Sequence, residues 1–136
     1  MKYFTVKELT HSNTAVKNNI DNTPSVEIQK RLELLIDNLL DPIRDMWGSP
    51  LMVSSGYRCS KLNKLVKGSS TSNHLNGCAA DLYPKDNTKI NRLKLFNMIK
   101  NSKLDFDELI WESGCIHVAY REKGNRHHVL DLSWKY

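Results

Sequence analysis

Apolar residues recur at three- and four-residue spacing in the first third of the chain, which is typical of a helix with one buried face. The pattern predicts a long helix with Thr23 as its N-cap and Pro24 at its first position. Pro42 interrupts the pattern because proline lacks a backbone donor, and Asp41 is expected to cap a new turn that ends at Gly48. The buried stripe of the long helix is expected to contain Ile28, Leu32, Leu35, Ile36 and Leu39.

Shorter patterns predict the remaining helices and the strands. Thr5 and Glu8 form a capping box for a short helix, and residues 60–66 and 88–102 are expected to be helical. In the second of these, Leu93, Phe96 and Ile99 are expected to face inward. Strands are expected at 51–54, 78–83, 106–111, 115–120 and 129–134, with turns at 113–114 and 123–125 between the last three. This order predicts a single α+β domain over residues 1–136, with helices packed on a mainly antiparallel sheet.

Three side chains have the chemistry and the placement of a metal site. His74 and Asp81 lie seven positions apart with Gly77 between them, which suits a loop that bends and re-enters on a strand. His117 lies in an alternating strand, on the face opposite to that of Ile116 and Val118. Two histidines and one carboxylate leave a position open for water, as catalytic zinc sites require.

The same residues carry a family resemblance. The stretches are SGYR at 55–58, SNHLNGCAAD at 72–81 and IHV at 116–118, together with YFTVKEL at 3–9 and LDPIR at 40–44. They resemble the zinc D-Ala-D-Ala carboxypeptidases and the related phage endolysins of peptidase family M15, in particular the M15A C-terminal-domain type. The resemblance covers nearly the whole chain. Hedgehog signalling domains share this fold, and residues 111–113 resemble their version of the segment.

The resemblance implies roles for individual residues. His74, Asp81 and His117 are expected to bind Zn²⁺, and Arg58 to contact substrate or to stabilise developing negative charge. Ser72 is a further candidate for substrate binding, although a loop serine often only satisfies nearby backbone.

The catalytic base is where the sequence departs from the family pattern. Many members have an acidic residue three positions before the last zinc ligand, but Gly114 occupies that position. Glu112 is the nearest acid, and a tight turn would fold it back toward the metal; the alternative is a solvated carboxylate at a hairpin end. Asp107 and Glu108 are weaker candidates.

The net charge restricts the possible binding partners only in part, and the cysteine content indicates the state of the thiols. The net charge of +5 favours an acidic partner, which could be nucleic acid, an anionic lipid or the anionic bacterial wall, and charge alone does not choose among them. The dispersed basic residues argue against nucleic acid. The three cysteines, Cys59, Cys78 and Cys115, are expected to be reduced thiols, with Cys78 in the core. His11, His127 and His128 are expected not to be ligands.

These observations predict a hydrolase that cuts peptidoglycan stem peptides at an amide next to a D-amino acid, as a carboxypeptidase or as a phage or prophage endolysin. The alternative is a non-catalytic, zinc-stabilised wall-binding domain. We expect a monomer without a membrane span. The charged N-terminal residues predict synthesis in the cytoplasm without a signal peptide, with action on the wall after release or export.

Overall fold

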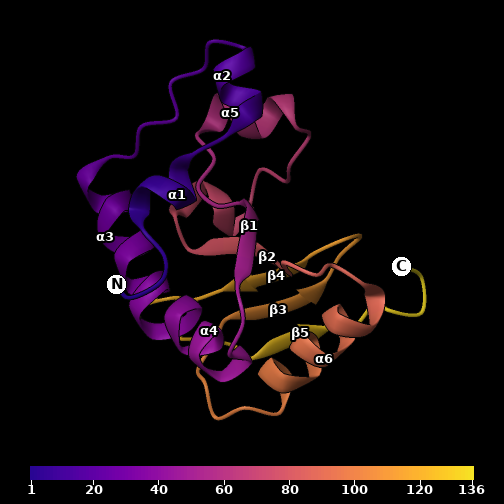
Figure 1. Ribbon diagram of the computed structural model, residues 1–136. Coiled ribbons are helices and arrows are strands. Elements are labelled where there is room, and N and C mark those ends of the chain that lie inside the picture. Colours follow the sequence, from indigo (N-terminus) through magenta and orange to yellow (C-terminus); the bar gives the residue numbers. More distant parts are fainter.

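A five-stranded sheet forms the centre of the computed structural model, which describes residues 1–136 (Figure 1). The strand order is β1-β2-β4-β3-β5, and all neighbours are antiparallel except β3 and β5, which are parallel. The strands are β1 (Leu51–Ser55), β2 (Ala79–Pro84), β3 (Glu108–Trp111), β4 (Ile116–Ala119) and β5 (His128–Leu130). The α+β class with a mainly antiparallel sheet is therefore confirmed.

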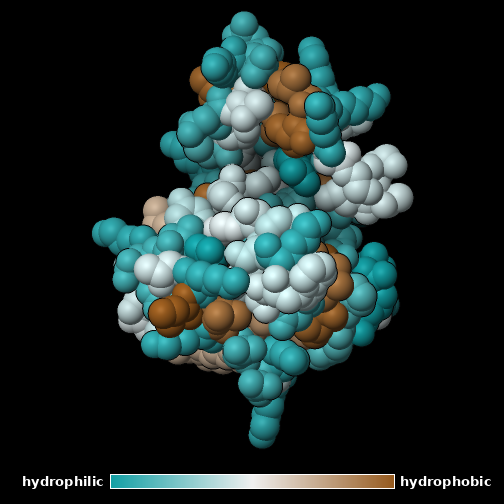
Figure 2. All heavy atoms as spheres, turned by 90° about the vertical axis from the view of Figure 1, so that its right-hand side faces the viewer, coloured by the Kyte–Doolittle hydropathy of each residue, from teal (hydrophilic) through white to brown (hydrophobic).

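Helices account for most of the remaining regular structure, and none has the length and apolar character needed to cross a membrane. The α-helices are α1 (Val6–Thr10), α2 (Asn13–Lys17), α3 (Val26–Leu35), α4 (Asp41–Trp47), α5 (Ser60–Leu65) and α6 (Lys89–Lys100). A π-helical turn, η1 (Ile36–Leu40), joins α3 to α4, and a 3₁₀ turn, η2 (Asn73–Asn76), precedes β2. Figure 2 shows the molecule from the side, with a narrow region between a broad lower part and an upper part. The upper part contains α2 and α5 (Figure 1).

The helical segment from α3 to α4 differs from the expectation at two points. It begins after Ser25, whose side chain accepts the backbone N–H of Ile28, so Thr23 and Pro24 lie outside it. Asp41 does not cap a new turn, because η1 keeps the helix continuous into α4. Its buried carboxylate instead accepts backbone N–H groups near the N-terminus of the chain, from Lys2, Tyr3 and Phe4.

One hydrophobic core joins the helices to one face of the sheet. Leu32 and Leu35 from α3 and Phe96 from α6 belong to it, together with Ala80, Leu82, Ile116 and Val118 from the central strands. In α6, Phe96 and Ile99 lie in the core and Leu93 packs against it, as expected, and Leu95 is an additional fully buried residue. Cys78 is also partly exposed, not in the core, and all three cysteines are free.

Because side chains alternate along a strand, the residues between the core positions face the other side of the sheet. Asp81 in β2 and His117 in β4 are two such residues, and they are direct cross-strand partners. Ile110 in β3 pairs with His117 from the other side. The sheet therefore has an apolar face toward the helices and a polar face around Asp81 and His117.

The last strand does not form a hairpin with β4 at the turn expected at residues 123–125. Residues 120–127 instead cross the start of β3, and β5 then runs parallel to β3 on its far edge. Asp107, which directly precedes β3, fastens this crossing loop: its backbone N–H donates to Ala119, and its carbonyl accepts from His128. The pairing partner of β5 depends on a contact outside the local turn, and the turn residues alone do not determine it.

Candidate metal centre

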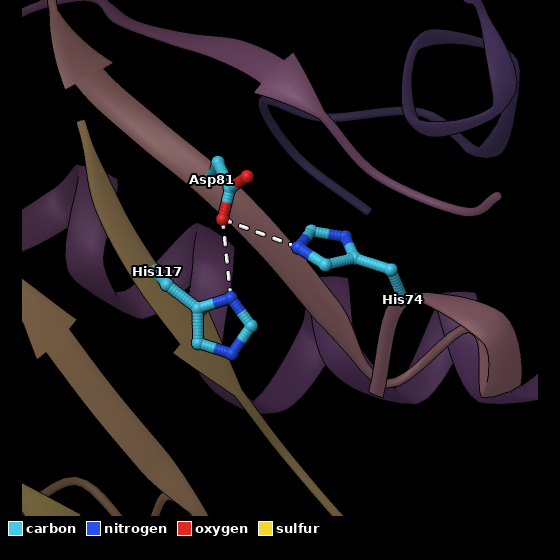
Figure 3. A group of neighbouring side chains, drawn as sticks. All are labelled: His74, Asp81 and His117. Atoms are coloured by element: carbon cyan, nitrogen blue, oxygen red, sulfur yellow. Dashed lines mark hydrogen bonds and ion pairs between the residues drawn. The ribbon is translucent and has the colours of Figure 1, made fainter. Parts of the chain in front are cut away.

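Three side chains converge on the polar face of the sheet (Figure 3). His74 comes from η2, Asp81 from β2 and His117 from β4. Oδ1 of Asp81 lies 3.2 Å from Nε2 of His74 and 3.1 Å from Nδ1 of His117. One ligand atom of each residue lies within 4.8 Å of the others, so the three form a group that could hold a metal ion. The donor atoms of a tetrahedral zinc site lie roughly 3.3 Å apart, which these distances match.

In each imidazole ring one nitrogen faces Asp81 and the other, outer nitrogen faces a different partner. The hydrogen bond of the outer nitrogen determines whether the nitrogen that faces Asp81 is free to bind a metal. Nδ1 of His74 lies 2.6 Å from the carbonyl oxygen of Gly56, and Nε2 of His117 lies 2.9 Å from Oε1 of Glu108. A carbonyl and a carboxylate only accept, so these ring nitrogens carry the hydrogens. In the neutral rings the nitrogens that face Asp81 then carry lone pairs. Three lone-pair atoms meeting at one point, each supported by an outer hydrogen bond, fit a divalent cation such as Zn²⁺.

The electrostatics of the group also favour a positive charge. Burial raises the pKa of Asp81, but the two imidazoles outweigh it and hold that pKa well below its usual range. Burial lowers the pKa of His117, whereas its hydrogen bonds to the carboxylates of Asp81 and Glu108 raise that pKa to about 9. A carboxylate that stays ionised beside such imidazoles is a strong cation-binding environment.

Two glycines explain how the local sequence places His74. Gly77 has a left-handed backbone with φ of +72°, and it turns the chain from η2 into β2 against Ile28 of α3. Gly56 is needed for close packing and not for a left-handed turn. A Cβ on Gly56 would collide with the backbone of Leu9, so the residue must be glycine for α1 to pack there. Its carbonyl is then available to His74.

Glu112 folds back toward the metal group, as the sequence suggested. Its backbone N–H bonds to the carbonyl of Cys115 at 3.1 Å, which closes a tight turn between β3 and β4. Ligand atoms of Glu112, Cys115 and Asp81 lie within 4.8 Å of one another. Burial, and then the negative charge of Asp81, raise the pKa of Glu112 to about 7. Burial likewise raises the pKa of the Cys115 thiol to about 12, so it stays protonated at neutral pH.

A cleft of about 580 Å³ opens over these residues. Arg58 and Ser72 line it, with Nη2 of Arg58 3.4 Å from Oγ of Ser72. The Ser72 hydroxyl also accepts the backbone N–H of His74 and so caps η2. Both readings of Ser72 thus have a structural basis, because one hydroxyl caps the backbone and faces the cleft.

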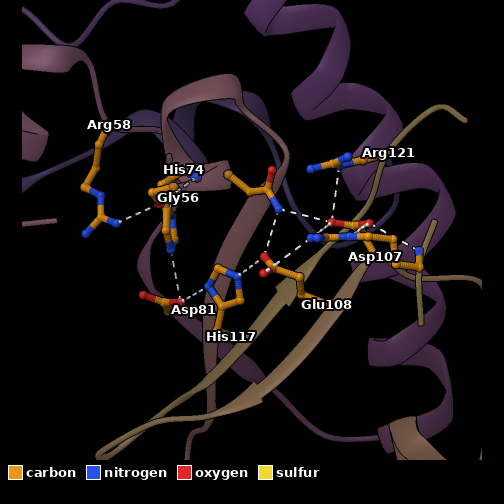
Figure 4. A network of polar contacts seen from close by, with 11 residues as sticks. Gly56, Arg58, His74, Asp81, Asp107, Glu108, His117 and Arg121 are labelled. Carbon is orange, nitrogen blue, oxygen red and sulfur yellow. Dashed lines mark hydrogen bonds and ion pairs between the residues drawn. The ribbon is translucent and has the colours of Figure 1, made fainter. Parts of the chain in front are cut away.

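The two weaker candidates for the base have other partners. Asp107 is fully buried and accepts from Nε and Nη2 of Arg126 at 3.0 and 2.9 Å (Figure 4). Glu108 lines the cleft, but its Oε1 is bonded to His117 and to Asn73. Glu108 is therefore placed to orient the ring of His117, and no sequence pattern had indicated this role.

Asn73 and two arginines, Arg121 and Arg126, line the same cleft, although no sequence pattern had marked them as site residues. The only sequence signal for the arginines was their position after the His117 strand, within a loop whose path was not predictable. The remaining histidines lie outside the metal group. His11 contacts Asn13, His127 contacts Asp105, and His128 is exposed.

The sequence matches the model of a known protein family. The family model described as Peptidase M15 matches residues 2–119, which include every residue of the metal group and Glu112. No curated protein matches the sequence.

Proposed function

The chain belongs to the peptidase M15 family, and from this premise we propose that it is a zinc-dependent peptidase that hydrolyses peptidoglycan stem peptides at an amide next to a D-amino acid. Peptidases of this family are zinc metallopeptidases, and the family suggests peptidoglycan as the substrate. The observation that carries the proposal is the position of Glu112 in one cleft with His74, Asp81 and His117. A metal group with a free carboxylate beside it is the minimum that metal-assisted amide hydrolysis needs.

In the proposed reaction, His74, Asp81 and His117 would hold the zinc. When bound, the zinc acts as a Lewis acid that polarises the scissile carbonyl and acidifies a water. Glu112 accepts a proton from the attacking water and then donates it to the leaving amine. Glu108 and the Gly56 carbonyl hold the two imidazole rings in the orientation that presents Nδ1 of His117 and Nε2 of His74.

Arg58 and Ser72 are the proposed substrate-binding residues on one side of the cleft. The guanidinium of Arg58 makes one long hydrogen bond, to Ser72, which leaves most of its donors free for a substrate carboxylate or carbonyl. A guanidinium beside the reacting carbonyl also stabilises the negative charge that develops there.

Two other readings remain distinct from this proposal. An endopeptidase of the endolysin type would cut elsewhere in the stem peptide or cross-bridge with the same residues. In a non-catalytic wall-binding domain the metal would serve the fold, and Gly114 in place of the usual acid favours that reading. The folded-back position of Glu112 favours an enzyme.

Digestion of purified peptidoglycan, followed by mass spectrometry of the soluble fragments, tests the proposal. We expect new amino groups and fragments that differ by hydrolysis of one amide next to a D-residue. Fragments cut at another amide would identify an endopeptidase. Binding to the wall without release of any new amino group would show that the protein is a wall-binding domain and not an enzyme.

A further inference from the structure

A second cationic end of the cleft lies across the metal group from Arg58. Figure 4 shows Arg58 on one side of His74, Asp81 and His117, and Arg121 on the other side. We propose that Arg121 and Arg126 form a second carboxylate-binding subsite, so that the substrate carries a carboxylate on each side of the scissile amide. This inference rests on the proposed function and specifies the substrate class of the same site.

The carboxylate of Asp107 binds both arginines and holds them in place. The fully buried Asp107 binds Arg126 through both carboxylate oxygens, and Oδ2 lies 3.3 Å from Nε of Arg121. Both arginines remain about half exposed, with side-chain exposures of 45% for Arg121 and 52% for Arg126. Arg121 uses only Nε on Asp107, so its two terminal nitrogens are free to bind a carboxylate as a fork.

The charges of the cleft favour an anionic ligand at this end. Asp81 and Glu108 are engaged by the imidazoles, and Asn73 also donates to Glu108. A divalent cation at the metal group leaves the cleft with a net positive charge. Of the 14 residues that line the cleft, Ile110 alone is hydrophobic, so the site suits a charged and polar peptide.

The cationic surface continues past Arg121. A second hollow, of about 400 Å³, shares Asn73 and Arg121 with the cleft and is lined further by Arg31 and Lys123, with Glu122 as its one acid. A peptide bound across the metal group therefore meets arginine at both ends, and the chain beyond Arg121 meets further basic residues. Long-range attraction of an acidic substrate follows from this distribution.

The subsite is tested by binding to zinc-loaded Glu112→Gln protein, so that hydrolysis does not interfere. The probes are synthetic peptides with a D-residue at the scissile amide and with either a carboxylate or a carboxamide on each side of it. We expect the peptide with a carboxylate on both sides to bind about 10-fold more tightly than the peptide in which the group that meets Arg121 is a carboxamide. Addition of Arg121→Gln removes that preference and leaves the affinity for the amidated peptide unchanged.

Lys94→Gln is the matched control, because it removes the same charge from an exposed residue of α6 outside the cleft. It should keep the preference. Equal affinities for carboxylate and carboxamide forms, no binding of either, or a preference that survives Arg121→Gln would overturn the subsite. Wild-type protein that leaves every peptide intact while the preference is present would instead count against the peptidase and leave the subsite standing.

Discussion

Nε2 of His117 lies 2.9 Å from Oε1 of Glu108, on the ring edge opposite the nitrogen that faces Asp81. The contact suits Glu108 to orient the ring of His117, a proposed metal ligand, and not to act as the base. Such partners determine the tautomer of the ring and raise its basicity, and their loss typically costs about 10- to 100-fold in metal affinity.

Glu108→Gln should therefore weaken zinc binding by about 10-fold, at the lower end of that range, because the amide oxygen still accepts the N–H but without the charge. Competition with a zinc-binding dye measures the affinity. Glu27→Gln on α3 is the control, since that carboxylate is exposed and lies outside the metal group. An affinity that does not change in Glu108→Gln would show that the contact has no influence on the metal.

The thiol of Cys115 should not bind the zinc. It lies near Asp81 and Glu112, but burial raises its pKa to about 12, and only the thiolate is a good ligand. Cys115→Ser should keep one zinc per chain, and X-ray absorption should show only nitrogen and oxygen neighbours. Sulfur in the first shell would indicate a structural site closed to water.

Gly77→Ala should destabilise the protein by about 1–3 kcal/mol more than Gly124→Ala. Both glycines have a left-handed backbone, with φ of +72° and +75°, so the conformational cost is shared. Only at Gly77 would the new Cβ meet neighbours, 2.9 Å from Cγ2 and 3.0 Å from the carbonyl oxygen of Ile28. Urea unfolding of the metal-free variants measures the difference. Equal losses would mean that α3 shifts without cost.

Asp107→Asn should lower the free energy of unfolding by about 2 kcal/mol at pH 7, because the buried side chain loses charge-assisted bonds to Arg126. Burial raises the pKa of Asp107, but the bonds to Arg126 outweigh it and hold the pKa below its ordinary value of 3.8. The ionised form is thus the one that stabilises the fold. The advantage of wild type over the variant should be complete above about pH 4 and should disappear as pH falls through the folded-state pKa.

Urea titrations of both proteins at several pH values between neutral and strongly acidic measure this difference. A gap between wild type and Asp107→Asn that stays constant into acid would mean that the charge of Asp107 contributes nothing. Comparison of the two proteins removes the effect of other carboxylates, which titrate in both.

The metal group was predictable because its geometry depends mostly on local patterns. The alternation around His117 put its side chain on the face away from the core, and Gly77 marked the turn between His74 and Asp81. The cross-strand pairing of Asp81 with His117, which joins residues 36 positions apart, completes the group and was not predicted by these patterns. Glu112 was found from a local pattern, since the turn that brings it back is closed within four residues.

What the sequence did not predict depends on contacts between distant segments. The role of Glu108 follows from the register of β3 on β4, and the positions of Arg121 and Arg126 follow from the crossing of β3 by the loop before β5. Asp41 is a similar case, because its buried carboxylate binds the first residues of the chain instead of capping the helix that begins with it. Residue patterns specify faces and turns, but not which distant partner will satisfy a buried charge.

Release of amino groups from purified peptidoglycan, measured together with zinc content, tests whether the protein is a zinc peptidase. Wild-type protein with one zinc per chain should be active, should lose activity when a chelator removes the metal, and should regain it when zinc is restored. Glu112→Gln should keep the zinc and the fold but lose about 10²- to 10⁴-fold in rate, as expected for a general base. Full activity in zinc-free protein would show that the reaction does not need the metal, and full activity in Glu112→Gln with its zinc in place would show that Glu112 is not the base.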